Sequence, residues 1–459
     1  MIPKRPINAD VPAPEEQAAT EPAPAQEEEL APKRADTAAS QAVDPVEPSV
    51  RRRQPRPLAP KLLAALAALA VLFIVVAIVG SSGGKDKSPN GGAPAPVTSD
   101  NSSSAPPASQ TSEALGYPSF ATNNTTRIGG SGPASNAAGV ALAVFPSVTA
   151  KQRPGAVTLA GEEDWAGAIA ASVLMAAPAR SPILFSTPDE LPAETAEALA
   201  ALDPQGGKAT GGASLFAIGP VALPDGAGKV TRVDSGDPAA TAAEIATLRD
   251  RLFGKPPAHI LVASSSSPDF AMPAAAWAAR SGDPILYTDA DKLPAATAAA
   301  LKGHPKVPVY VLGPTAAISA DVLKEIAKVS QQVQRVAGAD PASNAIALAR
   351  SHHGSFGWNV TDPGHGFVLA RSDSPASAAA AAALSASGTW GPLLLTEDPD
   401  TLPETLRSYL LDVKPGYTTD PTRAFYNHVW VIGDQDAIGV DQQAEVNELA
   451  ELAKIESEP

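Results

Sequence analysis

From about Thr122 onward, short runs of apolar residues alternate with longer, Ala-rich stretches. The apolar runs lack the alternation of a half-buried strand, which is typical of strands covered on both faces of a parallel sheet. Strands followed by helices imply right-handed crossovers and a doubly wound α/β architecture. In the middle of this region the pattern predicts strands at Thr231–Asp234, His259–Ala263, Pro284–Thr288 and Val309–Gly313, and helices at Pro238–Leu252, Asp269–Arg280, Pro294–Leu301 and Ala320–Val329.

Four sequence anchors recur in the same order in three copies, which indicates an internal repeat. Each copy has an Arg six residues before a Pro, a Pro-[Ile/Leu]-Leu strand, a Leu-Pro pair, and an apolar strand that ends in Gly. The sequence therefore predicts three tandem Rossmann-like units with parallel sheets, at 122–231, 232–334 and 335–459. Their anchors are Arg127, Arg232 and Arg335; Pro182, Pro284 and Pro392; Leu191, Leu293 and Leu402; and Gly219, Gly313 and Gly433.

The region before the repeats divides into three segments. Residues 1–61 are rich in Pro, Ala and Glu, and this composition predicts a disordered tail. Leu62–Gly80 contains no charged residue over 19 positions, enough for one transmembrane helix. The five bases between Arg51 and Lys61 place the N-terminus in the cytoplasm by the positive-inside rule, and the repeats outside the cell membrane of a single-pass protein. Residues 81–121 are rich in Gly, Ser, Pro and Asn and are predicted to be a flexible linker.

The amino-acid composition excludes several kinds of site and partner. The chain has no Cys, which excludes disulfides, thiolate metal sites and thiol catalysis. Its net charge of −15 does not suit nucleic acid, which is bound through a surplus of Lys and Arg. Most of this charge falls after Gly80, where 25 bases face 39 acids.

No motif of a known active site is found in a supporting context. The letters G-x-S-x-G occur at Gly80–Gly84, but in the linker and not at a strand-to-helix turn. Neither a P-loop nor a G-x-G-x-x-G turn is present, so the sequence gives no reason to expect a cofactor. His352, His353 and His365 could hold a metal, but surface histidines are the more common outcome. We therefore expect no catalytic residues, no metal and no cofactor.

The repeated anchors supply candidate ligand-binding residues. Ser186, Thr288 and Thr396 end the Pro-[Ile/Leu]-Leu strands, and the carboxyl edge of an open α/β sheet is where ligands bind. Aromatic side chains near these positions could stack on a sugar ring, namely Phe185, Tyr287, Trp165 and Trp390. For Phe185 a place in the hydrophobic core is the more natural expectation. The three Arg anchors either pair with acids between repeats or contact an anionic ligand.

These anchors resemble the cell-wall-binding repeat of type 2, which occurs in three tandem copies in surface proteins of Gram-positive bacteria. The resemblance rests on Arg127-Ile128, Arg232-Val233 and Arg335-Val336, on the three Pro-[Ile/Leu]-Leu strands, and on the Gly that ends each last strand. It implies three Rossmann-like units about a pseudo-threefold axis that bind a secondary cell-wall polymer non-covalently. The chain departs from the family at Pro133, Pro238 and Pro341, where an Arg is usual, so it looks like a divergent member.

Two functions follow as hypotheses. The first is a membrane-tethered extracytoplasmic module that binds cell-wall polysaccharide and carries out no catalysis. Because the external region is acidic, binding of an anionic polymer would need local basic clusters or bridging divalent cations. The alternative is a structural scaffold of the cell envelope that recruits a cytoplasmic protein partner through its acidic, Pro-rich tail.

Overall fold

The computed structural model describes residues 122–387 and 391–455. The predicted tail, the membrane span Leu62–Gly80, the linker and Trp390 lie outside the described residues. Within the described ranges, no helix combines the length and hydrophobicity needed to cross a membrane.

The described chain alternates strands and helices as the sequence predicts, and in the middle region the observed elements begin and end within about two residues of the predicted ones. The helices are α3 (Pro133–Val144), α4 (Trp165–Ala171), α5 (Ala193–Leu202), α6 (Pro238–Phe253), α7 (Pro268–Ser281), α8 (Ala295–Gly303), α9 (Ala320–Ala327), α10 (Pro341–Arg350), α11 (Pro375–Ser385), α12 (Glu404–Asp412) and α13 (Val440–Ala450). The strands are β1 (Thr125–Ile128), β2 (Val157–Gly161), β3 (Ile183–Ser186), β4 (Leu215–Ile218), β5 (Val230–Val233), β6 (Ile260–Ser264), β7 (Ile285–Thr288), β8 (Val309–Leu312), β9 (Val333–Val336), β10 (Gly366–Arg371), β11 (Leu393–Thr396), β12 (Gly416–Tyr417), β13 (His428–Ile432) and β14 (Ala453–Lys454).

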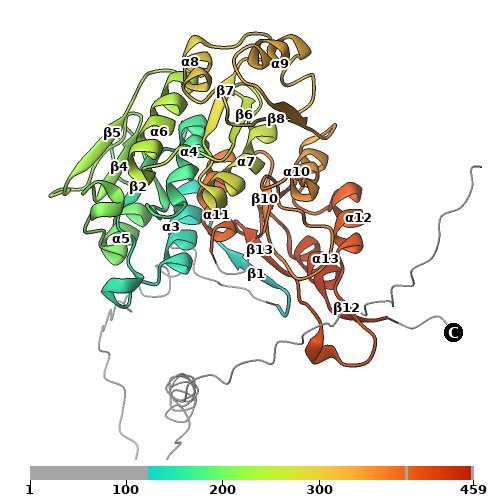
Figure 1. Ribbon diagram of the computed structural model, residues 1–459. Helices are drawn as coiled ribbons and strands as arrows, with labels where there is room; N and C mark the ends of the chain where they lie inside the picture. Colours follow the sequence, from blue (N-terminus) through green and yellow to red (C-terminus); the bar gives the residue numbers. More distant parts are fainter. Residues whose placement is uncertain (1–121, 388–390, 456–459) are drawn as a thin grey trace, which may run out of the picture. The chain divides into compact units, whose positions relative to one another are not determined.

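Most of these strands form three four-stranded parallel sheets (Figure 1). The first sheet has the order β3-β2-β4-β5, the second β7-β6-β8-β9, and the third β1-β13-β10-β11. A short parallel pair, β12 and β14, stands apart from them. The fold is therefore α/β with parallel sheets, as expected from the unbroken apolar runs.

Each Arg anchor lies on a strand that completes the sheet of a different predicted unit. Strand β5 pairs with β4 and completes the first sheet, so the boundary predicted between residues 231 and 232 falls inside a strand. In the same way β9 completes the second sheet beside β8. Strand β1, at the start of the described chain, pairs with β13 near its end, with Arg127 opposite Val431. The first and last parts of the chain are thus joined by backbone hydrogen bonds.

Ala-rich helices fill the space between the sheets. Helix α11 packs against α3, α4 and α7, and these helices lie together in the middle of the domain (Figure 1). Every residue of Ala376–Leu384 is buried. Because Ala side chains are small, helix axes can approach closely at such contacts. The central helices therefore bury their surface against one another as well as against the sheets.

Asp-Pro pairs stand at the starts of α6 and α10, where the Asp side chain caps the helix. Asp237 accepts hydrogen bonds from the backbone N–H groups of Ala239 and Ala240, both at 3.0 Å, and Pro238 occupies the first helical position. Asp340 caps α10 in the same way, with its carboxylate 2.7 Å from the N–H of Ser343. Proline is well suited to the first turn, where its missing N–H costs nothing.

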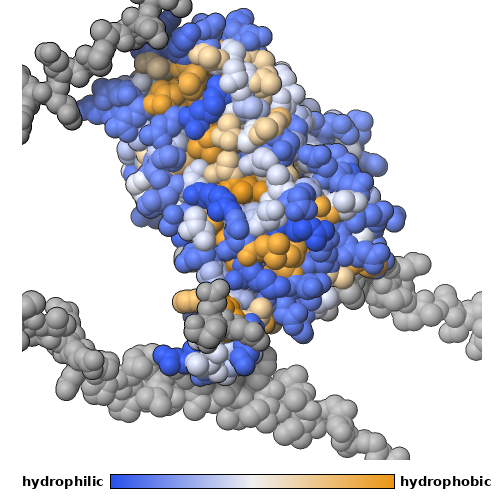
Figure 2. Space-filling model, turned by 90° about the vertical axis from the view of Figure 1, so that its right-hand side faces the viewer, coloured by the Kyte–Doolittle hydropathy of each residue, from blue (hydrophilic) through white to orange (hydrophobic). Residues whose placement is uncertain are grey.

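The surface visible in Figure 2 is the side that carries the orange and red elements of Figure 1. On this side hydrophobic residues are gathered in separate patches between hydrophilic ones. This distribution gives no single large apolar area on that face.

Candidate functional site

The three hydroxyl residues predicted at strand ends are buried and close the loops that follow them. The Oγ of Ser186 donates to the carbonyl of Glu190 at 3.2 Å, and the Oγ1 of Thr288 donates to the carbonyl of Lys292 at 3.0 Å. Thr396 donates to the carbonyl of Asp398 at 3.3 Å. All three side chains have 0% exposure. Their hydrogen-bonding capacity is used inside the fold, so direct contact with a ligand would require the loop to open.

The exposed parts of the same loops are acidic. They carry seven acids and one Lys, namely Asp189, Glu190, Asp289, Asp291, Lys292, Glu397, Asp398 and Asp400. Backbone N–H groups of Asp400 and Thr401 donate to the Asp398 carboxylate at 2.8 and 2.9 Å, and this lowers the pKa of Asp398. A carboxylate with a lowered pKa stays ionised in mildly acidic solution. These loops therefore offer negative charge to an incoming ligand.

The aromatic candidates that the structure describes lie in the core and at a contact between the first and second sheets. Phe185 and Tyr287 are fully buried. The Tyr287 hydroxyl donates to the carbonyl of Ala166 in α4 at 2.8 Å, and its ring meets Trp165 edge to face with 5.9 Å between centroids. Burial raises the pKa of Tyr287 well above its ordinary value, so this hydroxyl remains a donor. These contacts hold α4 against β7.

Arg127 is buried and binds the loop after β13. Its Nη1 donates to the carbonyls of Gly433 and Asp434 at 2.9 and 2.6 Å, and its Nη2 donates to the carbonyl of Ile438 at 2.6 Å. Its Nε and Nη2 also donate to the side-chain oxygen of Gln443, at 3.1 and 2.8 Å. Burial lowers the pKa of Arg127, and the charge of Asp434 opposes that effect. The hydrogen bonds go to carbonyl oxygens, and not to the acids proposed as one alternative from the sequence.

Arg335 makes the corresponding contacts in the second sheet. Its Nη1 donates to the carbonyl of Gly313 at 2.6 Å, and its Nη2 donates to the carbonyl of Ile318 at 2.7 Å. Burial lowers the pKa of this guanidinium as well. Arg127 and Arg335 thus each bind the loop that joins the neighbouring strand of the sheet, β13 or β8, to the helix that follows that strand, α13 or α9.

Arg232 differs, because its side chain is exposed on β5. In the first sheet, the chain after β4 continues through an irregular segment, residues 219–229, and enters no helix comparable to α9 or α13. No loop of the same form surrounds this Arg. Of the three Arg anchors, Arg232 is therefore the one best placed to meet a molecule in solvent.

The acidic triplet Glu162-Glu163-Asp164 lies just beyond β2. Asp164 caps α4 by accepting from the N–H of Gly167 at 2.9 Å. Burial raises the pKa of Asp164, and the nearby charge of Asp234 raises it further. Burial also raises the pKa of Glu162. Asp164 therefore has a structural role at the start of α4, beyond the carboxyl end of β2.

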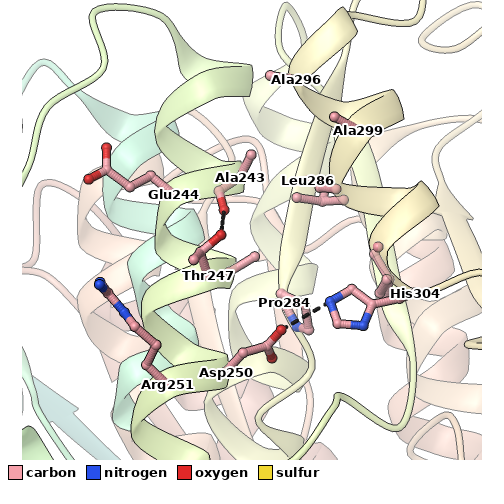
Figure 3. Close-up of a pocket in the computed structure, with 14 residues that line it drawn as sticks. Ala243, Glu244, Thr247, Asp250, Arg251, Pro284, Leu286, Ala296, Ala299 and His304 are labelled. Atoms are coloured by element: carbon pink, nitrogen blue, oxygen red, sulfur yellow. Dashed lines mark hydrogen bonds and ion pairs between the residues drawn. The ribbon is translucent and has the colours of Figure 1, made fainter.

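A groove of about 630 Å³ lies between α6 and α8, over the edge strand β7 (Figure 3). Five of its 14 lining residues are Ala, among them Ala243, Ala296 and Ala299. At one end the His304 imidazole lies 3.0 Å from the Asp250 carboxylate. The groove offers few converging polar groups, which ligand sites normally provide.

A second cavity of about 530 Å³ has a richer chemistry that sequence reasoning missed. It is lined by residues from the second sheet region and from the loop before β10, among them His259, Asp283, Ser355 and Trp358. The signal available in the sequence was Gly354-Ser355-Phe356-Gly357, a Ser between glycines. Nothing in that stretch showed that His259, 96 positions earlier, would lie beside it.

The histidines considered for a metal are dispersed. His365 lies 3.5 Å from Asp362, and His353 packs on Tyr310 with 5.7 Å between ring centroids. Over residues 122–387 and 391–455, no group of three or more His, Asp or Glu side chains is arranged to hold a metal ion.

Comparison with known proteins supports the resemblance seen in the anchors. Residues 232–323 match the family model of cell wall binding domain 2 (CWB2), which confirms the resemblance for the middle of the chain. The chain is also 30% identical over 137 residues to the N-acetylmuramoyl-L-alanine amidase LytC of Bacillus subtilis (strain 168). That alignment covers 30% of this chain and 26% of LytC.

Two solved structures share the fold. Cwp8 from Clostridium difficile matches with a TM-score of 0.54 and 20% identity, over 72% of this chain and 52% of Cwp8. Cwp6 from the same organism matches with a TM-score of 0.55 and 19% identity, over 72% of this chain and 48% of Cwp6. The chain thus spans about a quarter of LytC and about half of each Cwp structure.

Proposed function

We propose that this protein is a membrane-tethered, extracytoplasmic module that binds cell-wall polysaccharide non-covalently through three α/β repeats. The observation that carries the proposal is the match of residues 232–323 to a cell wall binding domain. A domain of this kind suggests a cell-surface location and a cell-wall polymer as partner. The shared fold with Cwp8 and Cwp6 is consistent with it.

We further propose that the outer two repeats are divergent copies of the middle one, in a pseudo-threefold arrangement. The same strand order around each four-stranded sheet supports this, as does the packing of α4, α7 and α11 in the middle of the domain. Three related surfaces would bind successive parts of one polymer. Weak single contacts would then add up to a high avidity without any new interaction.

The polymer-binding surface proposed here is formed by the three loops after β3, β7 and β11. Ser186, Thr288 and Thr396 hold these loops from inside, and the exposed acids face the solvent. Carboxylate oxygens are the preferred ligands of Ca²⁺. Binding of an anionic polymer at these loops would therefore proceed through bridging Ca²⁺, whereas a neutral polymer would hydrogen-bond to the acids directly.

The direct test is retention of the 122–459 fragment on purified cell-wall sacculi. We expect the fragment to sediment with the sacculi in Ca²⁺-containing buffer and to be released when its domain is heat-unfolded. Absence of sedimentation both with and without Ca²⁺ would contradict the proposed function.

A paired substitution locates the surface. Replacing Asp289 and Asp291 by Asn should reduce retention several-fold, because it removes both exposed acids of the loop after β7. The control is Asp321→Asn on α9, another exposed acid outside these loops, which should leave retention unchanged. Equal behaviour of the two variants would place the binding surface elsewhere.

The membrane tether rests on the sequence of Leu62–Gly80 and on the bases between Arg51 and Lys61. Protease added to intact protoplasts should remove the large domain and leave a protected N-terminal stub of about 80 residues. Permeabilised protoplasts should lose the cytoplasmic part of that stub as well. Protection of the full chain in intact protoplasts would contradict this topology.

A further inference from the structure

His259 lies between an acid and a hydroxyl in the second cavity. Its Nδ1 is 2.9 Å from a carboxylate oxygen of Asp283, and its Nε2 is 3.0 Å from the Oγ of Ser355. His259 and Asp283 are buried at 5% and 1% exposure, whereas Ser355 is exposed. The three side chains therefore form a continuous hydrogen-bonded line from the interior to the surface.

Further hydrogen bonds orient the acid and fix the imidazole tautomer. One oxygen of Asp283 accepts from the backbone N–H of His259 at 3.0 Å, and the other accepts from the Nε1–H of Trp277 at 3.0 Å. A carboxylate that accepts these bonds stays an acceptor toward Nδ1, so the imidazole proton resides there. The Nε2 lone pair is then directed at the Ser355 hydroxyl, as a general base requires.

A rigid turn presents the Ser355 hydroxyl. His353 and Phe356 exchange two backbone hydrogen bonds, of 2.8 and 3.1 Å, which leaves Gly354 and Ser355 at the tip of the turn. Gly354 has φ +66°, a conformation that favours glycine in such turns. The Phe356 ring stacks on Tyr310 with 3.5 Å between centroids and meets Trp277 edge to face at 5.1 Å. The turn is thus anchored by packing, and Ser355 at its tip is exposed while its hydroxyl contacts His259.

Two tryptophans, Trp277 and Trp358, line the same cavity. The Nε1 of Trp358 is buried and has no hydrogen-bond partner. Trp277 and Trp358 also meet edge to face at 5.5 Å, so aromatic surface lies beside the polar line.

We propose that Ser355, His259 and Asp283 form a serine-hydrolase site that cleaves small carboxylic esters, a function beyond polymer binding. Ser355 and His259 are the catalytic residues, and Asp283 is the positioning residue. The arrangement has the connectivity and roles of the Ser-His-Asp triad, which recurs on unrelated folds.

In the first step the Ser355 oxygen attacks the ester carbonyl carbon, and the Ser355 proton moves to Nε2 of His259. The tetrahedral intermediate collapses as the carbon–oxygen bond to the alcohol breaks, and the alcohol leaves with that proton. Water then attacks the carbonyl carbon of the acyl group and gives a proton to His259. The bond between this carbon and the Ser355 oxygen breaks, His259 returns the proton to that oxygen, and the carboxylic acid departs.

The test is covalent labelling of the full-length chain with a fluorophosphonate, which displaces fluoride on reaction with an activated serine, together with hydrolysis of p-nitrophenyl acetate. We expect mass spectrometry to find the label on Ser355. Ser355→Ala should abolish labelling at this position and lower p-nitrophenyl acetate hydrolysis at least tenfold. The matched control is Ser235→Ala, which removes another exposed serine that hydrogen-bonds a side chain, Glu244, and should change neither readout.

A further variant separates catalysis from a structural role. Asp283→Asn should slow labelling and also shift the His259 proton from Nδ1 in ¹⁵N NMR spectra, a change that loss of packing alone would not produce. If wild-type Ser355 takes no label, while Ser355→Ala lowers only the melting temperature, the cluster is a structural latch and the proposal is wrong.

Discussion

Arg127→Ala is expected to lower the free energy of unfolding by about 3–5 kcal/mol, as measured by urea denaturation of the 122–459 fragment. The substitution removes the guanidinium that donates to the carbonyls of Gly433, Asp434 and Ile438, and leaves these carbonyls without that donor. It also frees Gln443, whose amide links Arg127 to Thr125. Because Arg127 is only 2% exposed, water cannot readily replace the lost donors.

Arg232→Ala is the matched control, since it changes the same position of the repeated anchor. Because Arg232 is exposed, its replacement by Ala should change the free energy of unfolding by no more than about 0.5 kcal/mol. Arg127→Lys should remain strongly destabilising, because an ammonium cannot reproduce the planar fork of donors. Equal losses for Arg127→Ala and Arg232→Ala would show that the clamp on the loop after β13 is not what stabilises the domain.

The strands and helices of the middle region could be predicted because short stretches of the sequence determine them. Unbroken apolar runs such as the one in Ile260–Ser264 are typical of strands buried in a parallel sheet, and Pro238 stands at a helix start. Which sheet a strand joins depends on residues far away in the sequence and cannot be deduced from the strand's own residues. Nothing within Val230–Val233 shows that this strand pairs with β4, so the sequence placed the unit boundary inside it.

The site residues were harder to predict for a related reason. A repeated hydroxyl at a strand end is compatible with a ligand contact and with loop closure, and only the distances from Ser186 to Glu190 and from Thr288 to Lys292 distinguish them. The line of Ser355, His259 and Asp283 joins two segments that are far apart in the sequence. No spacing rule connects them, because the packing of the loop before β10 on the second sheet creates the contact.

The parts of the domain are expected to unfold together in a single transition, and isolated units should not fold. The reason lies in strand sharing: a fragment of residues 232–334 ends inside β9 and begins inside β5, so it cuts two strands that complete sheets. The Ala-rich helices α7 and α11 would also lose each other as packing partners. With so few large side chains in these helices, the core left within one unit is small.

A truncation series tests this cooperativity by calorimetry. The 122–459 fragment should show one transition, with a calorimetric enthalpy equal to the van't Hoff enthalpy. The 130–459 fragment lacks β1, which removes Arg127 and exposes the edge of β13, an unpaired edge that favours aggregation. We expect this shorter fragment to lose the cooperative transition altogether, because the backbone bonds that join the first and last parts of the chain are gone. Separate transitions for the 122–459 fragment, or independent folding of the 232–334 fragment, would instead mean that each unit has a sufficient core of its own.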